Sequence, residues 1–90
     1  MMVRLRIAGR VQGVAYRAWA EGEAAALGLS GWVRNRRNGS VEMVLSGDSD
    51  DVEAMIARCH RGPRMAQVES VRREDEDAAP EPGFRQLPTA

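Results

Sequence analysis

The junction between the first expected strand and the first expected helix is the feature that most constrains this chain. Residues 3–7 alternate apolar side chains with arginines, which predicts a strand with one buried and one exposed face. Gly9 and Gly13 follow it, and a helical pattern then begins with Arg17 in its first turn. A loop at such a junction directs several backbone N–H groups into one small space, and the helix N-terminus adds about half a positive charge. The junction therefore predicts a compact pocket for a phosphate-like group.

Arg17 would add a full positive charge to this pocket, with a planar fork of donors that fits two phosphate oxygens. The loop is not a P-loop, because no Gly-Lys-Ser/Thr sequence ends it. The spacing of Gly9 and Gly13 also differs from that of the dinucleotide-binding fingerprint. Considered alone, Arg17 is compatible with a solvated position on the helix surface as well.

Hydrophobic periodicity along the chain predicts the element order β-α-β-β-α-β. The expected elements are a strand at 3–7, a helix at 16–27, strands at 29–36 and 40–46, a helix that opens at 47–51 and ends at Gly62-Pro63, a weaker strand at 65–72, and a short edge strand at 84–87. This order is that of the split βαβ, or ferredoxin-like, class of α+β fold. We therefore expect one domain over residues 1–90, a sandwich in which two helices cover one face of an antiparallel sheet.

Turn residues separate these expected elements. Gly28 would end the first helix, and Asn38-Gly39 predicts a tight hairpin in which both residues take positive φ. The Asp-rich run at 48–51 suits the N-terminus of the second helix. The acidic run at 74–77 and the Ala-Ala-Pro-Glu-Pro sequence after it are expected to form a polar connector.

Charge and composition exclude several function classes. The chain has 13 basic and 13 acidic residues, so its zero formal charge gives no general attraction to nucleic acid or membrane. All its basic residues are arginines, which excludes Schiff-base chemistry on a lysine. Cys59 is the only cysteine, and there is no signal peptide or membrane-length apolar run, so we expect a cytoplasmic protein without an internal disulfide. The adjacent Cys59 and His60 have no further ligand pair, so we expect no metal site.

Two segments resemble the signatures of one known family, the acylphosphatases. The first signature is similar to Gly9-Arg10-Val11-Gln12-Gly13-Val14-Ala15-Tyr16-Arg17, and the second to Gly31-Trp32-Val33-Arg34-Asn35 followed by Asn38-Gly39-Ser40-Val41-Glu42 and Gly47. The similarity extends from Val3 to about Phe84. It implies the ferredoxin-like fold, and it implies an enzyme that hydrolyses the carboxyl–phosphate bond of small acyl phosphates with no metal or cofactor.

The resemblance also implies roles for individual residues. The phosphate would be bound by Arg17 and by the loop residues Gly9, Arg10, Val11, Gln12, Gly13, Val14 and Ala15. Asn35 would orient the attacking water through its side-chain amide. Phosphoryl transfer passes through a loose, in-line transition state, so positioning and charge stabilisation do most of the catalytic work. The carboxylate leaving group needs little or no protonation, which is consistent with a site without a histidine, cysteine or carboxylate base.

Several residues keep a second interpretation. Asn35 is also compatible with a turn-forming asparagine, and Gln12 is either a polar loop residue or a substrate contact. Arg36 and Arg37 either add positive potential to the site or are solvated hairpin residues. His60 suits a contact with the dipole of the second helix.

Two other function classes remain open on the residues alone. Ferredoxin-like sheets can bind RNA through exposed aromatic side chains, but this chain has only two tryptophans, one tyrosine and one phenylalanine. The other alternative is a non-catalytic anion sensor. We expect instead a monomeric enzyme whose partners are a small acyl phosphate and inorganic phosphate, with no nucleic acid and no membrane.

Overall fold

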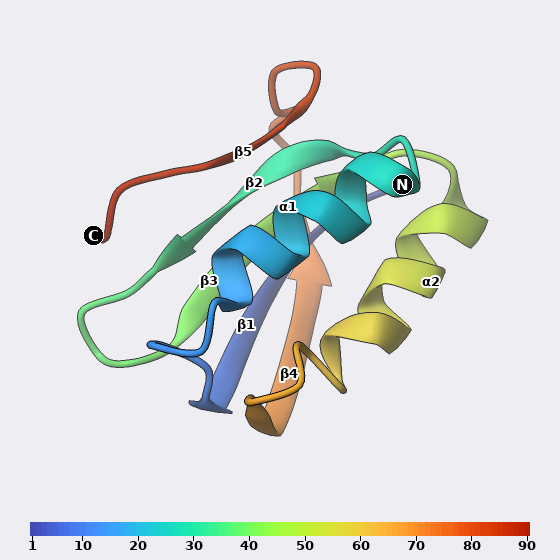
Figure 1. The fold of residues 1–90 in the computed structure, drawn as a ribbon. Helices are drawn as coiled ribbons and strands as arrows, with labels where there is room; N and C mark the ends of the chain where they lie inside the picture. The colour runs from blue at the N-terminus through green and yellow to red at the C-terminus, as the bar shows by residue number, and fades with distance from the viewer.

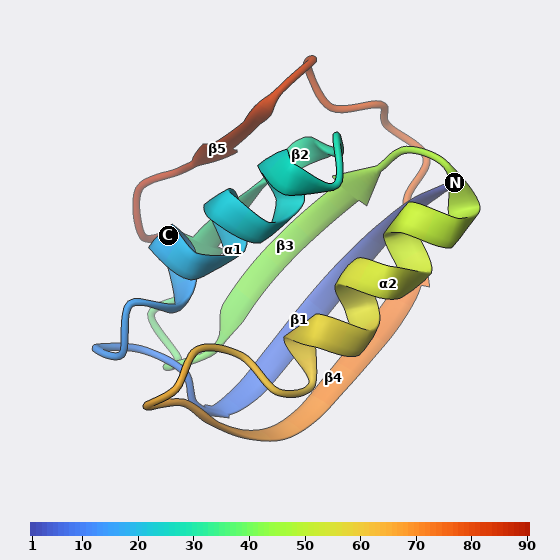
Figure 2. The same cartoon turned by 45° about the vertical axis from the view of Figure 1, so that its right-hand side comes forward.

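Two helices pack side by side on one face of a five-stranded sheet (Figures 1 and 2). The computed structural model describes residues 1–90. Its elements are β1 (Met2–Arg10), α1 (Tyr16–Ala26), β2 (Ser30–Asn35), β3 (Val41–Ser46), α2 (Ser49–Cys59), β4 (Gln67–Asp75) and β5 (Phe84–Gln86). The expected β-α-β-β-α-β order and the short edge strand after it are thus confirmed.

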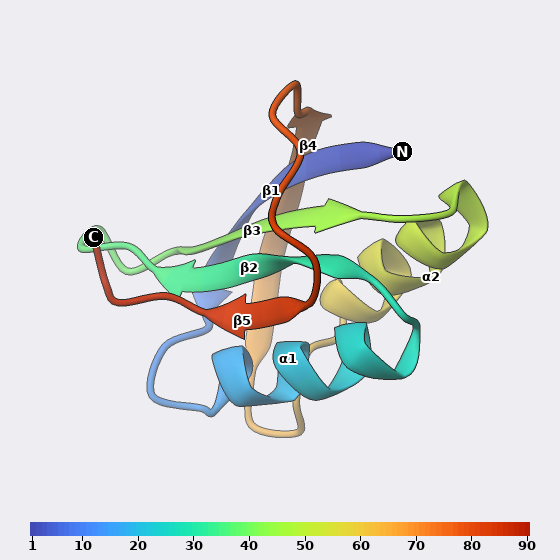
Figure 3. The same cartoon turned by 90° about the horizontal axis from the view of Figure 1, so that it is seen from above.

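The strand order in the sheet is β4-β1-β3-β2-β5. β1 is antiparallel to β3 and β4, and β2 is antiparallel to β3, as expected. The sheet is nevertheless mixed, because β5 pairs in parallel with β2. After β4 the chain crosses the sheet near the beginnings of β1 and β2, where Glu76 N–H bonds to Met2 C=O and Gly31 N–H bonds to Gly83 C=O (Figure 3). β5 therefore starts at the same end of the sheet as β2 and runs in the same direction.

β4 extends further than the sequence pattern predicts. Glu74 and Asp75, expected in a polar connector, lie in the strand and pair with Arg4 and Val3 of β1. Two ion pairs hold this acidic end: Arg6 Nη2 lies 3.4 Å from Glu74 Oε1, and Arg4 Nε lies 3.1 Å from Glu76 Oε1. Opposite charges across neighbouring strands offset the low strand preference of acidic residues.

The hairpin between β2 and β3 also differs from the expected turn. Only Gly39 has a positive φ, of 93°, whereas Asn38 does not. The N–H of Gly39 bonds to the C=O of Arg36 at 3.1 Å, and the N–H of Arg36 bonds to the C=O of Ser40 at 2.8 Å. Asn38 instead contributes its Oδ1, which accepts the N–H of Ser40 at 3.0 Å. The loop is thus a turn followed by one left-handed glycine, a common hairpin of three loop residues.

The hydrophobic core lies between the sheet and the two helices. Its members alternate along the strands and recur at helical spacing: Val3, Leu5, Ile7, Val33, Val41, Met43, Leu45, Tyr16, Ala20, Ala24, Val52, Met55, Ile56 and Cys59 are all buried. Full burial of each Val, Leu, Ile or Met side chain stabilises the fold by about 1.5–3 kcal/mol. The Tyr16 hydroxyl donates to the C=O of Cys59 at 2.7 Å, which fastens the start of α1 to the end of α2.

Candidate active site

The loop from Val11 to Ala15 connects the end of β1 to the start of α1 (Figure 1). Val11 is fully buried and anchors the loop in the core. Ala15, the residue that caps α1, has φ 63° and ψ 30°, a left-handed conformation that is strained for any residue with a Cβ. No side chain caps the helix, and its first turn contains no acidic residue. The first N–H groups of α1 therefore stay available to an anionic ligand.

A pocket of about 150 Å³ lies above this loop. Its walls are formed by Val11, Gln12, Gly13, Ala15, Tyr16, Arg17, Ala18, Asn35 and Gln86. The structure thus brings Arg17 and Asn35 into one cavity. β1 and β2 are both antiparallel to β3, so their C-terminal ends lie at the same edge of the sheet. This strand order is the reason why residues 18 positions apart meet.

Three of the expected phosphate-binding residues do not line this pocket. Gly9 and Arg10 belong to β1 and pair with Val68 and Gln67 of β4, and Val14 packs against the core. Gly9 lies at a register shift in this pairing, and a Cβ there would come within 2.3 Å of the C=O oxygen of Gln67. A side chain at position 9 would therefore push β4 away from β1.

Asn35, the last residue of β2, lines the pocket and contains an unsatisfied acceptor. Its Oδ1 is buried and has no hydrogen-bond partner. Leaving such an acceptor unpaired costs about 1–3 kcal/mol, so this atom is suited to accept a hydrogen bond from a bound ligand or water. The turn bond of the hairpin is made by Asn38 rather than by Asn35. Asn35 therefore does not form the turn.

Gln12 links the loop to the β2–β3 hairpin. Its Nε2 donates to the C=O of Arg36 at 2.8 Å and to the C=O of Ser40 at 2.9 Å. Both residues flank the turn directly after Asn35. Gln12 therefore fixes the position of the β1–α1 loop relative to Asn35, a structural role that its sequence context does not reveal.

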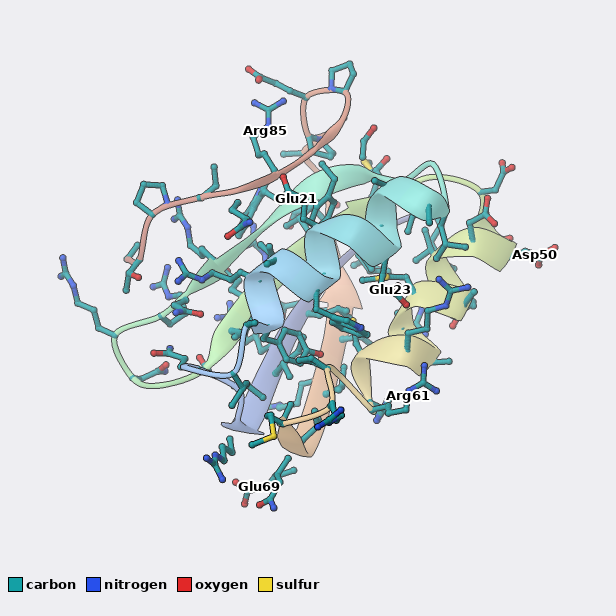
Figure 4. All side chains as sticks on the ribbon, in the orientation of Figure 1. Glu21, Glu23, Asp50, Arg61, Glu69 and Arg85 are labelled. Carbon is teal, nitrogen blue, oxygen red and sulfur yellow. The ribbon has the colours of Figure 1, made fainter.

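Gln86 of β5 was not expected in the pocket. It pairs with Val33 of β2, and its Nε2 donates to Glu21 Oε1 on α1 at 2.9 Å (Glu21 is labelled in Figure 4). This hydrogen bond ties β5 to α1 beside the pocket. No local motif marks Gln86, since its place depends on the parallel pairing of β5.

The electrostatics of the pocket are those of an anion site. Arg17 forms no ion pair, and the pocket walls contain no Asp, Glu, His or Cys side chain. Burial raises the pKa of the Tyr16 hydroxyl, which stays protonated and bonded to Cys59 C=O. No group of three His, Cys, Asp or Glu side chains is placed to hold a metal ion. No helix combines the length and apolar character that a membrane crossing requires.

A ferredoxin-like domain with an arginine and an uncapped helix N-terminus around a small pocket is suited to bind a phosphate group. The family model described as Acylphosphatase matches residues 3–86. The acylphosphatase of Rhizorhabdus wittichii is 52% identical over 86 residues, 96% of this chain and 87% of that protein. The acylphosphatase of an Azoarcus species is 58% identical over 87 residues, 94% of this chain and 87% of that protein. The structure of an acylphosphatase from Coxiella burnetii, 31% identical, superposes with a TM-score of 0.91 and covers 96% of this chain and 90% of that one. This chain belongs to the acylphosphatase family.

Proposed function

We infer that this chain hydrolyses the carboxyl–phosphate bond of small acyl phosphates and releases a carboxylate and inorganic phosphate. One observation supports this most strongly: Arg17, the uncapped start of α1 and Asn35, whose Oδ1 has no hydrogen-bond partner, line one small pocket. The first two features suit a phosphoryl group, and the third suits a water molecule beside it. The membership in the acylphosphatase family supports the same reaction.

In this proposal the phosphoryl group binds to Arg17 and to backbone N–H groups of the loop around Gln12 and Gly13. The planar guanidinium donates to two phosphoryl oxygens, while the N-terminus of α1 adds its partial positive charge. Gly9, Arg10 and Val14 support the loop from outside the pocket walls. The contacts with phosphate then come from the wall residues between Val11 and Arg17.

Asn35 in this proposal holds the attacking water in line with the bond to the carboxylate. Its Oδ1 accepts one hydrogen bond from the water, which leaves an oxygen lone pair directed at phosphorus. A neutral amide is a poor base, so Asn35 contributes position rather than proton abstraction. The reaction tolerates this because its transition state is loose and its leaving group is a stable carboxylate.

The proposal includes a metal-independent reaction by a monomeric, single-domain, cytoplasmic protein that needs no cofactor and no nucleic-acid partner. The balanced charge supports the expectation about nucleic acid, and the single buried thiol of Cys59 suits a reducing compartment. Size-exclusion chromatography with light scattering tests the oligomeric state directly.

The activity is tested by hydrolysis of benzoyl phosphate in the presence of EDTA. We expect turnover by the wild type and its near-complete loss in Arg17→Ala and Asn35→Ala. Removing Asn35 should raise the activation free energy of the kcat step by about 2–4 kcal/mol, as for a lost transition-state donor, and so lower kcat. KM should change little. Arg61→Ala is the matched control, because Arg61 is exposed at the end of α2, away from the pocket (Figure 4). No turnover by a folded wild type would overturn the proposed reaction.

A further inference from the structure

The face of the sheet opposite the helices carries more arginine side chains than acidic side chains. Figure 3 shows this face free of helices. Its arginines come from three strands and the hairpin: Arg4, Arg6, Arg34, Arg36 and Arg72. The carboxylates beside them are Glu42, Glu74 and Glu76. This face is therefore positive although the whole chain is neutral.

At one end of this face the carboxylates are too few to neutralise all the arginines. The side chain of Glu42 is 6% exposed and is shared by Arg4, by Arg36 at 3.3 Å and by Arg6 at 3.9 Å. Arg4 is also bonded to Glu76, and Arg6 is paired with Glu74 at 3.4 Å. Arg72 forms no ion pair. It lies directly opposite Arg6, a second cation, across the β1–β4 ladder. Like charges in such facing positions destabilise a sheet.

A hollow of about 280 Å³ lies at this end of the face. Arg6, Arg36 and Arg72 line it, together with the polar residues Asn38, Ser40 and Ser70. The guanidinium groups come from β1, the hairpin and β4. Three cations line this cavity, and fewer carboxylates than cations lie beside it. The cavity therefore has a positive electrostatic potential that attracts an anion.

We propose that this hollow is a second anion site, distinct from the catalytic pocket, that binds a small phosphate-bearing ligand. A phosphate or diphosphate group offers enough acceptor oxygens for three guanidinium groups and the Ser70 hydroxyl, whereas a single carboxylate offers two. The bound anion would also neutralise the repulsion between Arg6 and Arg72. The inference does not depend on the reaction proposed above, because the hollow shares no wall residue with the catalytic pocket.

The remainder of the face argues for a compact ligand rather than an RNA strand. Glu74, which is paired with Arg6 beside the hollow, and Glu76 further along the face would repel an extended phosphate backbone. Trp32, the aromatic residue of this region, has Arg4 and Arg34 over its ring at 5.5 and 5.2 Å, so its face is already occupied. Sequence-tolerant RNA binding needs a free aromatic surface for stacking.

The hairpin connects the two sites. Arg36 and Ser40 line the hollow on one side, and their C=O groups accept the two hydrogen bonds of Gln12 on the other. An anion bound by Arg36 would hold the hairpin in the position on which Gln12 depends. We therefore expect occupancy of the hollow to be sensed by the backbone amides next to Asn35.

The test is an NMR titration of the full chain with inorganic pyrophosphate at constant ionic strength, repeated with adenosine diphosphate. We expect two saturable sets of amide shifts in the wild type, one around Gly13 and Arg17 and one around Ser40 and Ser70. Arg72→Gln should weaken the second set at least tenfold and leave the first unchanged, while Arg17→Ala should do the reverse. Tighter binding of adenosine diphosphate than of pyrophosphate would show that the ligand contributes more than its phosphates.

The control is Arg61→Gln, which removes the same charge from the exposed end of α2. An equal weakening of the second set in this variant would show non-specific charge attraction and would overturn the proposal. So would the lack of any saturable shift at Ser40 and Ser70 in a folded wild type. Saturable binding of a single-stranded oligoribonucleotide with shifts along all of β1 and β2, tighter than that of pyrophosphate, would replace the small ligand with RNA.

Discussion

Arg17 stands in the first turn of α1 without a carboxylate partner, and its contribution to the pocket combines charge with shape. A lysine at this position would keep the charge, but its ammonium group is a compact point charge on a flexible stem. The two substitutions Arg17→Lys and Arg17→Ala therefore separate the effect of charge from that of the planar fork.

We expect Arg17→Lys to lower kcat/KM for benzoyl phosphate at least tenfold, because one ammonium cannot donate to two phosphoryl oxygens in the same geometry. The inhibition constant of inorganic phosphate should rise in parallel, which steady-state kinetics with phosphate as a competing ligand would measure. A lysine variant with wild-type kcat/KM would show that the site uses only the charge of Arg17.

Gln12 offers a test of positioning without a change in charge. We expect Gln12→Leu to lower kcat about tenfold and to change KM less, because the loop loses its two bonds to the hairpin that carries Asn35. Each of the two C=O groups keeps its backbone N–H donor within the hairpin, so only the two side-chain hydrogen bonds are lost, which should destabilise the fold by about 1–3 kcal/mol. Steady-state kinetics and urea denaturation measure the two effects.

Gln67→Leu is the matched control for Gln12, since Gln67 is an exposed glutamine at the start of β4. It should leave kcat unchanged. If Gln12→Leu lost stability but kept its full kcat, the two hydrogen bonds would be structural only.

At the scale of helices and strands, local patterns predict most of the fold correctly. The alternation of Val3, Leu5 and Ile7 and the helical spacing of Val52, Met55, Ile56 and Cys59 depend only on neighbouring residues, and these elements appear where expected. The end of β4 does not follow from its own sequence, because the arginines that pair with Glu74 and Glu76 lie on β1. The parallel pairing of β5 likewise depends on where the connector from β4 crosses the sheet.

The residues of the candidate site also divide into those that a local sequence pattern reveals and those that depend on distant parts of the chain. Arg17 and the loop before it are encoded by one continuous segment, which the sequence reveals through its glycines and its helix start. The meeting of this loop with Asn35 depends on the strand order, and the contribution of Gln86 depends on β5. Side chains from distant segments can be assigned to the site only when the pairing of the strands is known.

The contact between β4 and α2 gives stability a defined pH dependence. Arg73 donates to both carboxylate oxygens of Glu53, at 2.8 and 3.0 Å, and this bond lowers the pKa of Glu53 below its ordinary 4.5. Below pH 4.5 the unfolded chain begins to protonate Glu53 before the folded chain does. The stabilisation is therefore present above that pH and is lost as the pH falls through the lowered folded pKa.

We expect Glu53→Gln to be less stable than the wild type at pH 7, and we expect this difference to shrink as the pH falls below the ordinary carboxyl pKa towards pH 3. Urea denaturation at both pH values measures the difference. Glu69→Gln is the control, because Glu69 is an exposed carboxylate of β4 without an ion pair (Figure 4), and its effect should not follow this pH dependence. A stability difference of the same size at pH 7 and at pH 3 would assign the effect of Glu53 to packing.

At the scale of the whole molecule, the single thiol reports the integrity of the core. Cys59 is fully buried, and burial raises its pKa to about 12. A thiol reagent reacts with the thiolate, so the folded protein should resist labelling at pH 8. We expect the labelling rate, followed with a chromogenic disulfide, to rise with urea in step with loss of helical circular dichroism. Rapid stoichiometric labelling without denaturant would instead show that the end of α2 opens locally.

The pairing of β1 with β4 has a consequence for the order of events during folding. Val3 lies opposite Asp75, and the loop to which we assign the phosphate begins where β1 ends. Pairings between residues so distant in the chain close slowly, because a long loop must lose its conformational entropy before the contacts form. The pocket also needs Asn35 from β2 and Gln86 from β5. Enzymatic turnover should therefore be among the last properties to return on refolding, after the helices have formed.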